Sequence, residues 1–142
     1  MNNQPLPVTK TSNWDDLLKE AMKAREYSYS PYSQYKVGAA LLTRKGTIYK
    51  GCNIENAGYT PSVCAERTAI FKAISEGESD FVAMAVVTLN GGAPCGVCRQ
   101  VMREFAPDLI VIVGDINGNY QVFTLPDLLP HSFGPENLPR PE

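Results

Sequence analysis

The fold of this chain is decided by residues 81–113, which read FVAMAVVTLNGGAPCGVCRQVMREFAPDLIVIV. Phe81 to Thr88 is almost continuously apolar, a pattern typical of a strand that is buried on both faces. A helix is predicted from Cys95 to about Phe105, because Pro94 suits the first turn of a helix. Leu109 to Val113 is a second buried strand. Strands that alternate with helices indicate an α/β fold.

Further elements flank this segment on both sides. Hydrophobic periodicity and turn signals predict helices over residues 14–24 and 64–75, and strands over residues 37–43, 47–54 and 120–124. We therefore expect a three-layer α/β/α sandwich with a mixed five-stranded sheet. A single domain is expected over residues 13–138, with Asn13 capping the first helix, between a flexible N-terminal arm (1–12) and a C-terminal tail (139–142).

Composition limits the classes of protein to which the chain can belong. It has 142 residues, 44% of them hydrophobic, with 13 Lys and Arg against 15 Asp and Glu. The formal net charge of −2 argues against a dedicated nucleic-acid or membrane-surface binder. No secretory signal or membrane-spanning stretch is visible, so we expect a cytoplasmic protein. In a reducing compartment, cysteines are more often metal-binding or catalytic than disulfide-bonded.

Three of the four cysteines lie at predicted helix starts. Cys95 and Cys98 form a CxxC pair that directly follows Pro94, and Cys64 begins the preceding helix. The CxxC spacing lets two sulfurs meet on one tetrahedral ion, and a helix N-terminus stabilises thiolates. A redox dithiol has the same spacing but usually follows the first strand of a thioredoxin-like chain, whereas this pair lies late.

The three cysteines together predict a catalytic zinc ion. Three thiolates leave the fourth zinc position open, which distinguishes a catalytic site from a structural one. Glu66 follows Cys64 by two residues, where it can act on a zinc-bound water, as in the zinc-deaminase signature. The alternative, a structural zinc, needs a fourth protein ligand, for which Cys52 and His131 are the remaining candidates.

The chain resembles the small, homotetrameric, zinc-dependent cytidine deaminases over about residues 14–138. The motifs that carry this resemblance appear in family order and are SPYS (30–33), VGAA (37–40), GCNIEN (51–56), CAERTA (64–69), PCGVCRQ (94–100) and FGP (133–135). The resemblance implies one Zn²⁺ per chain and the hydrolytic deamination of cytidine and deoxycytidine in pyrimidine salvage.

The resemblance also implies roles around the metal. Glu66 takes the proton of the attacking water, delivers it to N3 of the pyrimidine, and later protonates the departing ammonia. Three thiolates and Zn²⁺ sum to a net negative charge, which acidifies water poorly. In similar deaminases the arginine that matches Arg67 hydrogen-bonds the sulfurs and withdraws that charge. Gln100 is a weaker candidate for the same support.

Substrate contacts are expected from four further residues. Asn53 and Glu55 are two apart on a predicted strand, so they share one face while Ile54 points into the core. The family uses these matched positions on the ribose. The pyrimidine ring is expected against Tyr35, where the family often has Phe, and the backbone of Ala65 is expected to meet the pyrimidine carbonyl.

Three residues match positions that close a neighbouring subunit's pocket in related tetramers. They are Ala57, Tyr59 and Phe133. We therefore expect a homotetramer with pockets shared between subunits, a small-molecule nucleoside substrate, and no nucleic-acid or membrane partner.

Rival functions remain within and outside this fold. A blasticidin-S-type deaminase has the same zinc signature, but Asn53, Glu55 and the FGP motif (133–135) favour a nucleoside. A polynucleotide-editing deaminase would need a basic tract, which the chain lacks. A zinc-stabilised interaction module without activity is the alternative from a different class.

Overall fold

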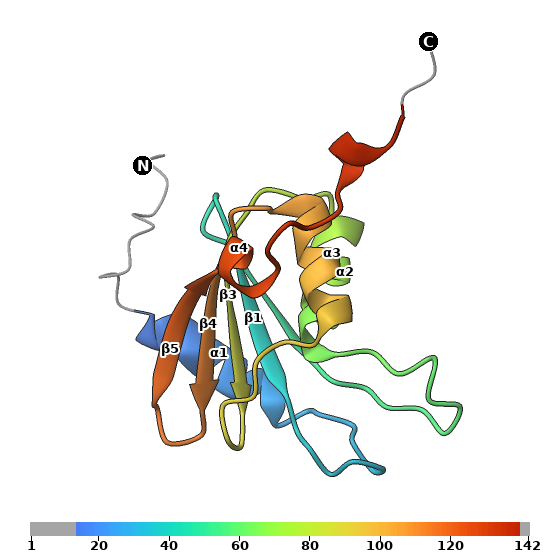
Figure 1. Ribbon diagram of the computed structural model, residues 1–142. Helices are drawn as coiled ribbons and strands as arrows, with labels where there is room; N and C mark the ends of the chain where they lie inside the picture. Colours follow the sequence, from blue (N-terminus) through green and yellow to red (C-terminus); the bar gives the residue numbers. More distant parts are fainter. Residues whose placement is uncertain (1–13, 140–142) are drawn as a thin grey trace.

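Five strands form one mixed sheet in the order β2-β1-β3-β4-β5 (Figure 1). The computed structural model describes residues 14–139. The strands are β1 (Gly38–Thr43), β2 (Ile48–Cys52), β3 (Phe81–Thr88), β4 (Ile110–Asp115) and β5 (Tyr120–Thr124). The central pair, β3 and β4, is parallel, and every other neighbouring pair is antiparallel. The mixed five-stranded sheet that the sequence predicts is therefore present.

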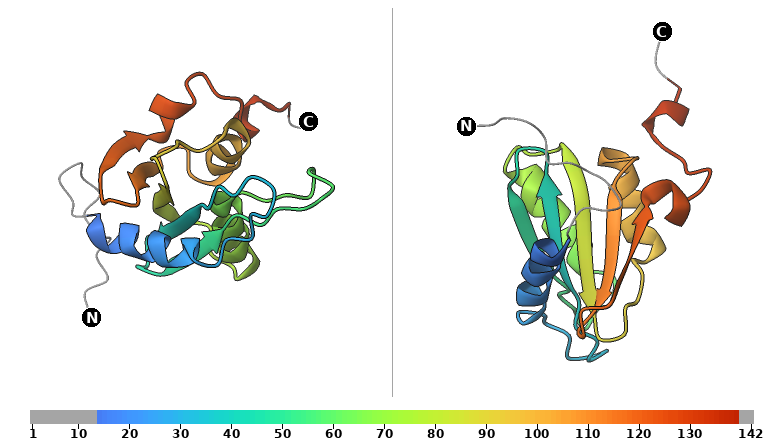
Figure 2. Two further views of the ribbon diagram at one scale, coloured as in Figure 1. Left: turned by 90° about the horizontal axis from the view of Figure 1, so that it is seen from below. Right: turned by 90° about the vertical axis from the view of Figure 1, so that its left-hand side faces the viewer.

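Helices cover both faces of the sheet (Figure 2). The longer helices are α1 (Asp15–Arg25), α2 (Ala65–Ser75) and α3 (Gly96–Phe105), followed by the short α4 (Leu125–Leu128) and a 3₁₀ turn at Pro135–Asn137. One face packs against α1, and the other packs against α2 and α3. The three-layer arrangement is thus confirmed. Within residues 14–139, no helix is both long enough and apolar enough to cross a bilayer.

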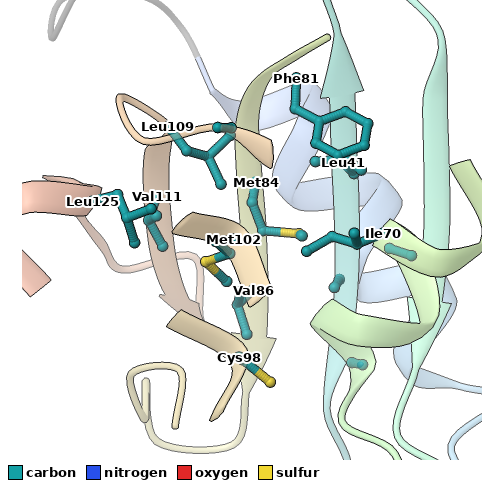
Figure 3. Packing of buried hydrophobic residues seen from close by; sticks show 14 of the residues in the cluster. Leu41, Ile70, Phe81, Met84, Val86, Cys98, Met102, Leu109, Val111 and Leu125 are labelled. Carbon is teal, nitrogen blue, oxygen red and sulfur yellow. The ribbon is translucent and has the colours of Figure 1, made fainter. Parts of the chain in front are cut away.

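Strand β3 contributes to both cores because its side chains alternate between the two faces of the sheet. Met84 and Val86 belong to the cluster under α2 and α3 (Figure 3), whereas Ala85 and Val87 belong to the cluster under α1. All eight residues of β3 are buried. This double burial explains the almost continuous apolar run in the sequence. Figure 3 also shows Cys98 at one end of the first cluster, beyond Val86.

A glycine in β2 lets helix α2 lie close to the sheet. A Cβ atom at Gly51 would lie 2.5 Å from the carbonyl oxygen of Ala65 and 2.6 Å from the backbone nitrogen of Ala69. Such contacts are too short for any side chain, so the first turn of α2 can take this place only beside glycine. The N-terminus of α2 is therefore held next to the end of β2.

The second strand is shorter than predicted. It ends at Cys52, and Ile54 makes only isolated bridges, with Tyr29 and with Val63. Ile54 is 46% exposed, so the expectation that it points into the core is wrong. The chain leaves the sheet because the segment after Cys52 pairs with the loop that follows α1 instead of continuing along β1.

Parts of the predicted domain division lie outside the described residues. The N-terminal arm (1–12), the capping role of Asn13 and most of the C-terminal tail (139–142) lie outside residues 14–139. The first helix starts at Asp15, with Trp14 buried before it. Asp15 and Asp16 are in its first turn, where negative charge is favoured by the helix dipole.

Candidate active site

The N-termini of α2 and α3 bring three cysteines together. Cys64 and Cys95 are the N-cap residues of the two helices, each with extended backbone, and Cys98 lies in the first turn of α3. Neither N-cap side chain bonds to its own helix. The first N–H groups of a helix have no partner within it, so both helix ends present positive potential to the sulfurs.

The spacing of the three sulfurs fits a zinc ion. Their Sγ atoms all lie within 4.8 Å of one another, and those of Cys64 and Cys95 are 3.8 Å apart. Zinc–sulfur bonds of about 2.3 Å at tetrahedral angles place two ligand sulfurs about 3.8 Å apart. Among residues 14–139, this is the one such cluster of potential ligands. Cys52 and His131 are not part of it, so the fourth position has no protein ligand among the described residues.

The sulfurs share their protons unequally. A hydrogen bond from Cys98, with smaller contributions from Arg67 and Cys95, lowers the pKa of Cys64 to about 5. The same hydrogen bond and burial raise the pKa of Cys98 above its ordinary value. Without metal, Cys64 is therefore a thiolate at neutral pH while Cys98 keeps its proton, which zinc must displace.

Zinc binding is consequently expected to weaken as the pH falls. Zinc binds the thiolate, so protons compete with it for the sulfur. For each proton that zinc must displace, the zinc affinity falls about tenfold when the pH falls by one unit. We expect at least this loss between pH 7 and pH 6, measured by competition with a chromophoric chelator at each pH. Calorimetry in buffers of different ionisation enthalpy counts the released protons. If the protein is folded at both pH values and its zinc affinity is the same at both, the prediction that zinc displaces a thiol proton is wrong.

Arg67 lies against the cluster. Its Nη2 donates to Cys64 Sγ at 3.4 Å, and the hydrogen bonds that it makes to Cys64 and Cys98 raise the pKa of the guanidinium. Its Nε is buried without a hydrogen-bond partner in the structure. Gln100 makes a different contact: its Nε2 donates to the carbonyl oxygen of Phe133 at 2.9 Å, and among the described residues it has no hydrogen bond to the sulfurs. Of the two residues expected to support the metal, only Arg67 makes a hydrogen bond to a sulfur of the cluster.

Glu66 is buried beside the three sulfurs. Its side chain is on the first turn of α2, and the residue is 3% exposed. Burial, reinforced by the negative charge of Cys64, raises the pKa of Glu66 to about 7. A carboxyl group with a pKa near the working pH can both accept and return a proton.

A cavity of about 580 Å³ opens onto Glu66, Cys64 and Cys95. This volume lies within the range of small-molecule sites. Besides Cys64 and Cys95, its wall includes Tyr35, Asn53 and Glu55. Three of the residues expected to contact substrate therefore line the same cavity as Cys64 and Cys95.

Asn53 and Glu55 face the cavity even though the strand ends before them. The Glu55 carboxylate accepts the N–H groups of Tyr32 (3.0 Å) and Ser33 (3.1 Å) as well as the Ser33 hydroxyl. These hydrogen bonds, that of the Ser33 hydroxyl first, hold the pKa of Glu55 below its ordinary value. Asn53 is buried and fastened to residues 28–37 through both ends of its amide. Contacts with that loop, rather than strand alternation, orient both side chains.

The remaining predicted substrate residues differ in burial: one is buried and the others are exposed. Ala65, the first residue of α2, is fully buried. Tyr59 is 75% exposed, lines the cavity, and packs edge-on against Tyr32 with ring centroids 6.3 Å apart. Ala57 and Phe133 are exposed and are not among the residues that line this cavity.

Sequence reasoning missed residues that orient the predicted ones. Ser33 bonds both Glu55 and the backbone of Tyr35, and Asn90 accepts the Tyr35 hydroxyl at 2.6 Å. The serine carries no local signal for this role. Tyr35 carries such a signal, because a partly buried tyrosine hydroxyl at a position that is often Phe requires a hydrogen-bond partner.

Comparison with known proteins identifies the family. Residues 11–114 match the family model described as the cytidine and deoxycytidylate deaminase zinc-binding region. The chain belongs to this family of deaminases. The predicted resemblance, the enzyme class and the zinc cofactor are thereby confirmed, since the family is zinc-binding and this deaminase gathers three thiols in metal-binding geometry.

Curated relatives and solved structures agree with this result. The cytidine deaminase of Halalkalibacterium halodurans is 52% identical over 125 residues, which cover 86% of this deaminase and 95% of the relative. The crystal structure of cytidine deaminase from Burkholderia pseudomallei superposes with a TM-score of 0.82 at 46% identity, covering 86% of this chain and 100% of that one. A blasticidin-S deaminase from Bacillus cereus is more distant, at 32% identity over 108 residues covering 69% of this chain and 76% of the relative.

Proposed function

We propose that this chain catalyses the zinc-dependent hydrolysis of cytidine and deoxycytidine to uridine and deoxyuridine with release of ammonia. The observation that carries the proposal is the placement of Glu66 beside three sulfurs that lie within 4.8 Å of one another, at a cavity that Asn53 and Glu55 also line. The relatives named cytidine deaminase, at up to 52% identity over most of the chain, support the same substrate.

Cys64, Cys95 and Cys98 hold the metal in this proposal. Zinc, when bound, supplies a water of lowered pKa, near 7, as the nucleophile that attacks C4 of the pyrimidine. Arg67 and the two helix N-termini reduce the negative charge that three thiolates leave on the site. With three protein ligands, a bound zinc ion would keep one coordination position free for water.

Glu66 moves the protons. As a carboxylate it takes the proton from the attacking water and delivers it to N3, which completes the addition to the ring. It then takes the remaining hydroxyl proton and gives it to the amine at C4, so that the C–N bond breaks and ammonia leaves. The pKa of about 7 produced by burial suits a group that gains and loses a proton in each turnover.

Asn53 and Glu55 bind the sugar. Three hydrogen bonds occupy the Glu55 carboxylate, which has about four acceptor positions, so one is left for a hydroxyl group. The Asn53 amide donates one N–H to the Tyr35 carbonyl at 2.8 Å and keeps the other available. The pyrimidine ring lies against Tyr35, and the N–H of Ala65 meets the pyrimidine carbonyl at the helix start.

Neighbouring subunits complete the pocket in the proposed homotetramer. Tyr59 is 75% exposed and Phe133 is 57% exposed, although both are large and apolar enough to favour burial. Ala57 lies on the same exposed loop as Tyr59. Tyr59, Phe133 and Ala57 would then close a neighbour's cavity, which explains why the two aromatic rings are solvent-facing in one chain.

Shared pockets predict that assembly and activity depend on Phe133. Phe133→Ala is expected to lower kcat/KM at least about fivefold, since truncating a buried interface aromatic often costs more than 1 kcal/mol. Tyr120→Ala, an exposed aromatic on β5, serves as the control. Light scattering coupled to gel filtration gives the oligomeric state and ultraviolet absorbance gives the rate. A monomer with full activity would exclude shared pockets.

A small nucleoside fits the surface charge as well. The net charge of −2 does not suit a polynucleotide, which needs cationic phosphate contacts. We place the reaction in pyrimidine salvage, which recovers free nucleosides. We also propose a cytoplasmic location, because a reducing compartment keeps the free thiols of the metal cluster available for zinc.

Ultraviolet absorbance during incubation with cytidine, deoxycytidine, CMP and blasticidin S tests the function. We expect spectral conversion of the first two, with one ammonia released for each nucleoside lost. Conversion of CMP alone would transfer the proposal to nucleotides, and conversion of blasticidin S alone would transfer it to the antibiotic. One zinc per chain without any conversion would favour the interaction module.

A further inference from the structure

A hydrogen bond joins two loops at the wall of the cavity. The hydroxyl of Tyr35 donates to Oδ1 of Asn90 at 2.6 Å. Tyr35 is on the loop between α1 and β1, and Asn90 is on the loop between β3 and α3 (Figure 1). The loop with Asn90 continues directly into Pro94 and Cys95, one of the three clustered cysteines. The bond therefore connects the side of the cavity that carries Asn53 and Glu55 with the side that leads to the sulfurs.

The other end of Tyr35 is held as well. Its N–H donates to Ser33 Oγ at 3.0 Å, and its carbonyl accepts Asn53 Nδ2 at 2.8 Å. With the backbone fixed in this way, the ring can move only by rotation of its side chain. The bond to Asn90 removes that freedom too, so the ring stays in one orientation at the cavity wall.

The loop that carries Asn90 lies close to the Tyr35 hydroxyl at Gly92 as well. A Cβ atom at Gly92 would lie 2.6 Å from that hydroxyl, and its next nearest neighbours would be 3.7 Å away or more. The N–H of Gly92 donates at 2.8 Å to Oγ1 of Thr88, which is 2% exposed at the end of β3. The loop is therefore anchored to the buried sheet on one side and to Tyr35 on the other.

We propose that Asn90 is a positioning residue, which through the Tyr35 hydroxyl holds the tyrosine ring in the orientation that receives the nucleoside. This inference rests on the proposed function and adds to it a residue outside the metal cluster and the sugar contacts. Among the described residues, neither Tyr35 nor Asn90 hydrogen-bonds Glu66 or the sulfurs. The pair governs substrate binding and leaves the proton transfers unchanged.

Substitution of Asn90 tests the proposal through the separation of KM from kcat. Asn90→Ala is expected to raise KM for cytidine about fivefold, the value of one neutral hydrogen bond, with kcat within about twofold of the wild type. Asn90→Asp keeps an acceptor oxygen at the same atom and is expected to restore KM. Asn117→Ala, in the exposed β4–β5 turn, is the matched control, and zinc per chain is measured for each variant.

Gly92 supplies an independent test. Gly92→Ala places its methyl group against the hydroxyl, so it is expected to raise KM as Asn90→Ala does. In a Tyr35→Phe background the hydroxyl is absent, and both Gly92→Ala and Asn90→Ala are expected to have no further effect on KM. Independent, multiplying effects in the double variants would show that the two loops do not act through this hydrogen bond.

The outcomes separate this proposal from the proposed function. A wild-type protein that holds zinc but does not convert cytidine contradicts the proposed function, and this inference with it. Conversion by the wild type with an unchanged KM in Asn90→Ala overturns the role of Asn90 alone. So does a loss that falls on kcat or on zinc content, because either would place the residue's effect at the metal.

Discussion

Glu66→Gln is expected to retain one zinc ion per chain and to lose nearly all turnover. The amide has the size of the carboxyl group and is neutral, so it fits a residue that is 3% exposed. It cannot accept the proton of water or return one to N3 and to the leaving ammonia. General acid–base groups contribute about 10²–10⁴-fold to a rate, and one that acts in several steps belongs at the upper end.

Steady-state ultraviolet assays and metal analysis of the same preparation check this prediction. Glu76→Gln is a matched control, because Glu76 is the exposed C-cap residue of the same helix and has no part in the cavity. Near-normal turnover in Glu66→Gln would remove Glu66 from the mechanism. Loss of zinc together with turnover would instead make it a support of the metal site.

Cys98→Ala is expected to abolish both zinc binding and activity. Cys98 is fully buried, and its sulfur is one of three within 4.8 Å. Removing a residue that only supports a zinc ligand typically costs 10- to 100-fold in affinity, so removing a ligand is expected to cost more than about 100-fold. Activity then disappears because the metal supplies the nucleophile.

Cys52 provides the control for this experiment. It is the fourth cysteine, a free thiol outside the cluster, and burial raises its pKa. Cys52→Ala is expected to keep one zinc per chain and wild-type turnover. Alanine is smaller than cysteine and keeps the core apolar, so we expect Cys98→Ala to fold. Its circular dichroism spectrum shows whether a loss of zinc occurs in a folded or an unfolded protein. A folded Cys98→Ala protein that still binds zinc at wild-type affinity would disprove the ligand set.

Binding of zinc is also expected to stabilise the fold, because the ligands come from two helices. A metal that binds only the folded state adds its binding free energy to the stability of that state. The α2 and α3 N-termini, which meet at the sulfurs, are the parts that gain most. This coupling is a further reason to compare the variants both with zinc and after chelation.

Local sequence determined most of the fold and the identity of the chemical groups. The alternation of turn signals with apolar runs located the strands, and the full burial of β3 follows from its unbroken apolar run. The spacing of Cys95 and Cys98, and of Cys64 and Glu66, predicts the zinc chemistry because each pair lies within one helical turn. Such features depend on neighbours in sequence, so no tertiary contact is needed to recognise them.

Tertiary structure decided which side chains face the cavity and what holds them there. Ile54 is exposed and Gln100 binds the backbone of Phe133, since partners remote in sequence outweigh strand periodicity and motif proximity. The bond between Tyr35 and Asn90 joins residues 55 positions apart. Contacts of that separation form only in the folded chain: here the antiparallel pairing of β1 with β3 brings the two loops together, and no local pattern records it.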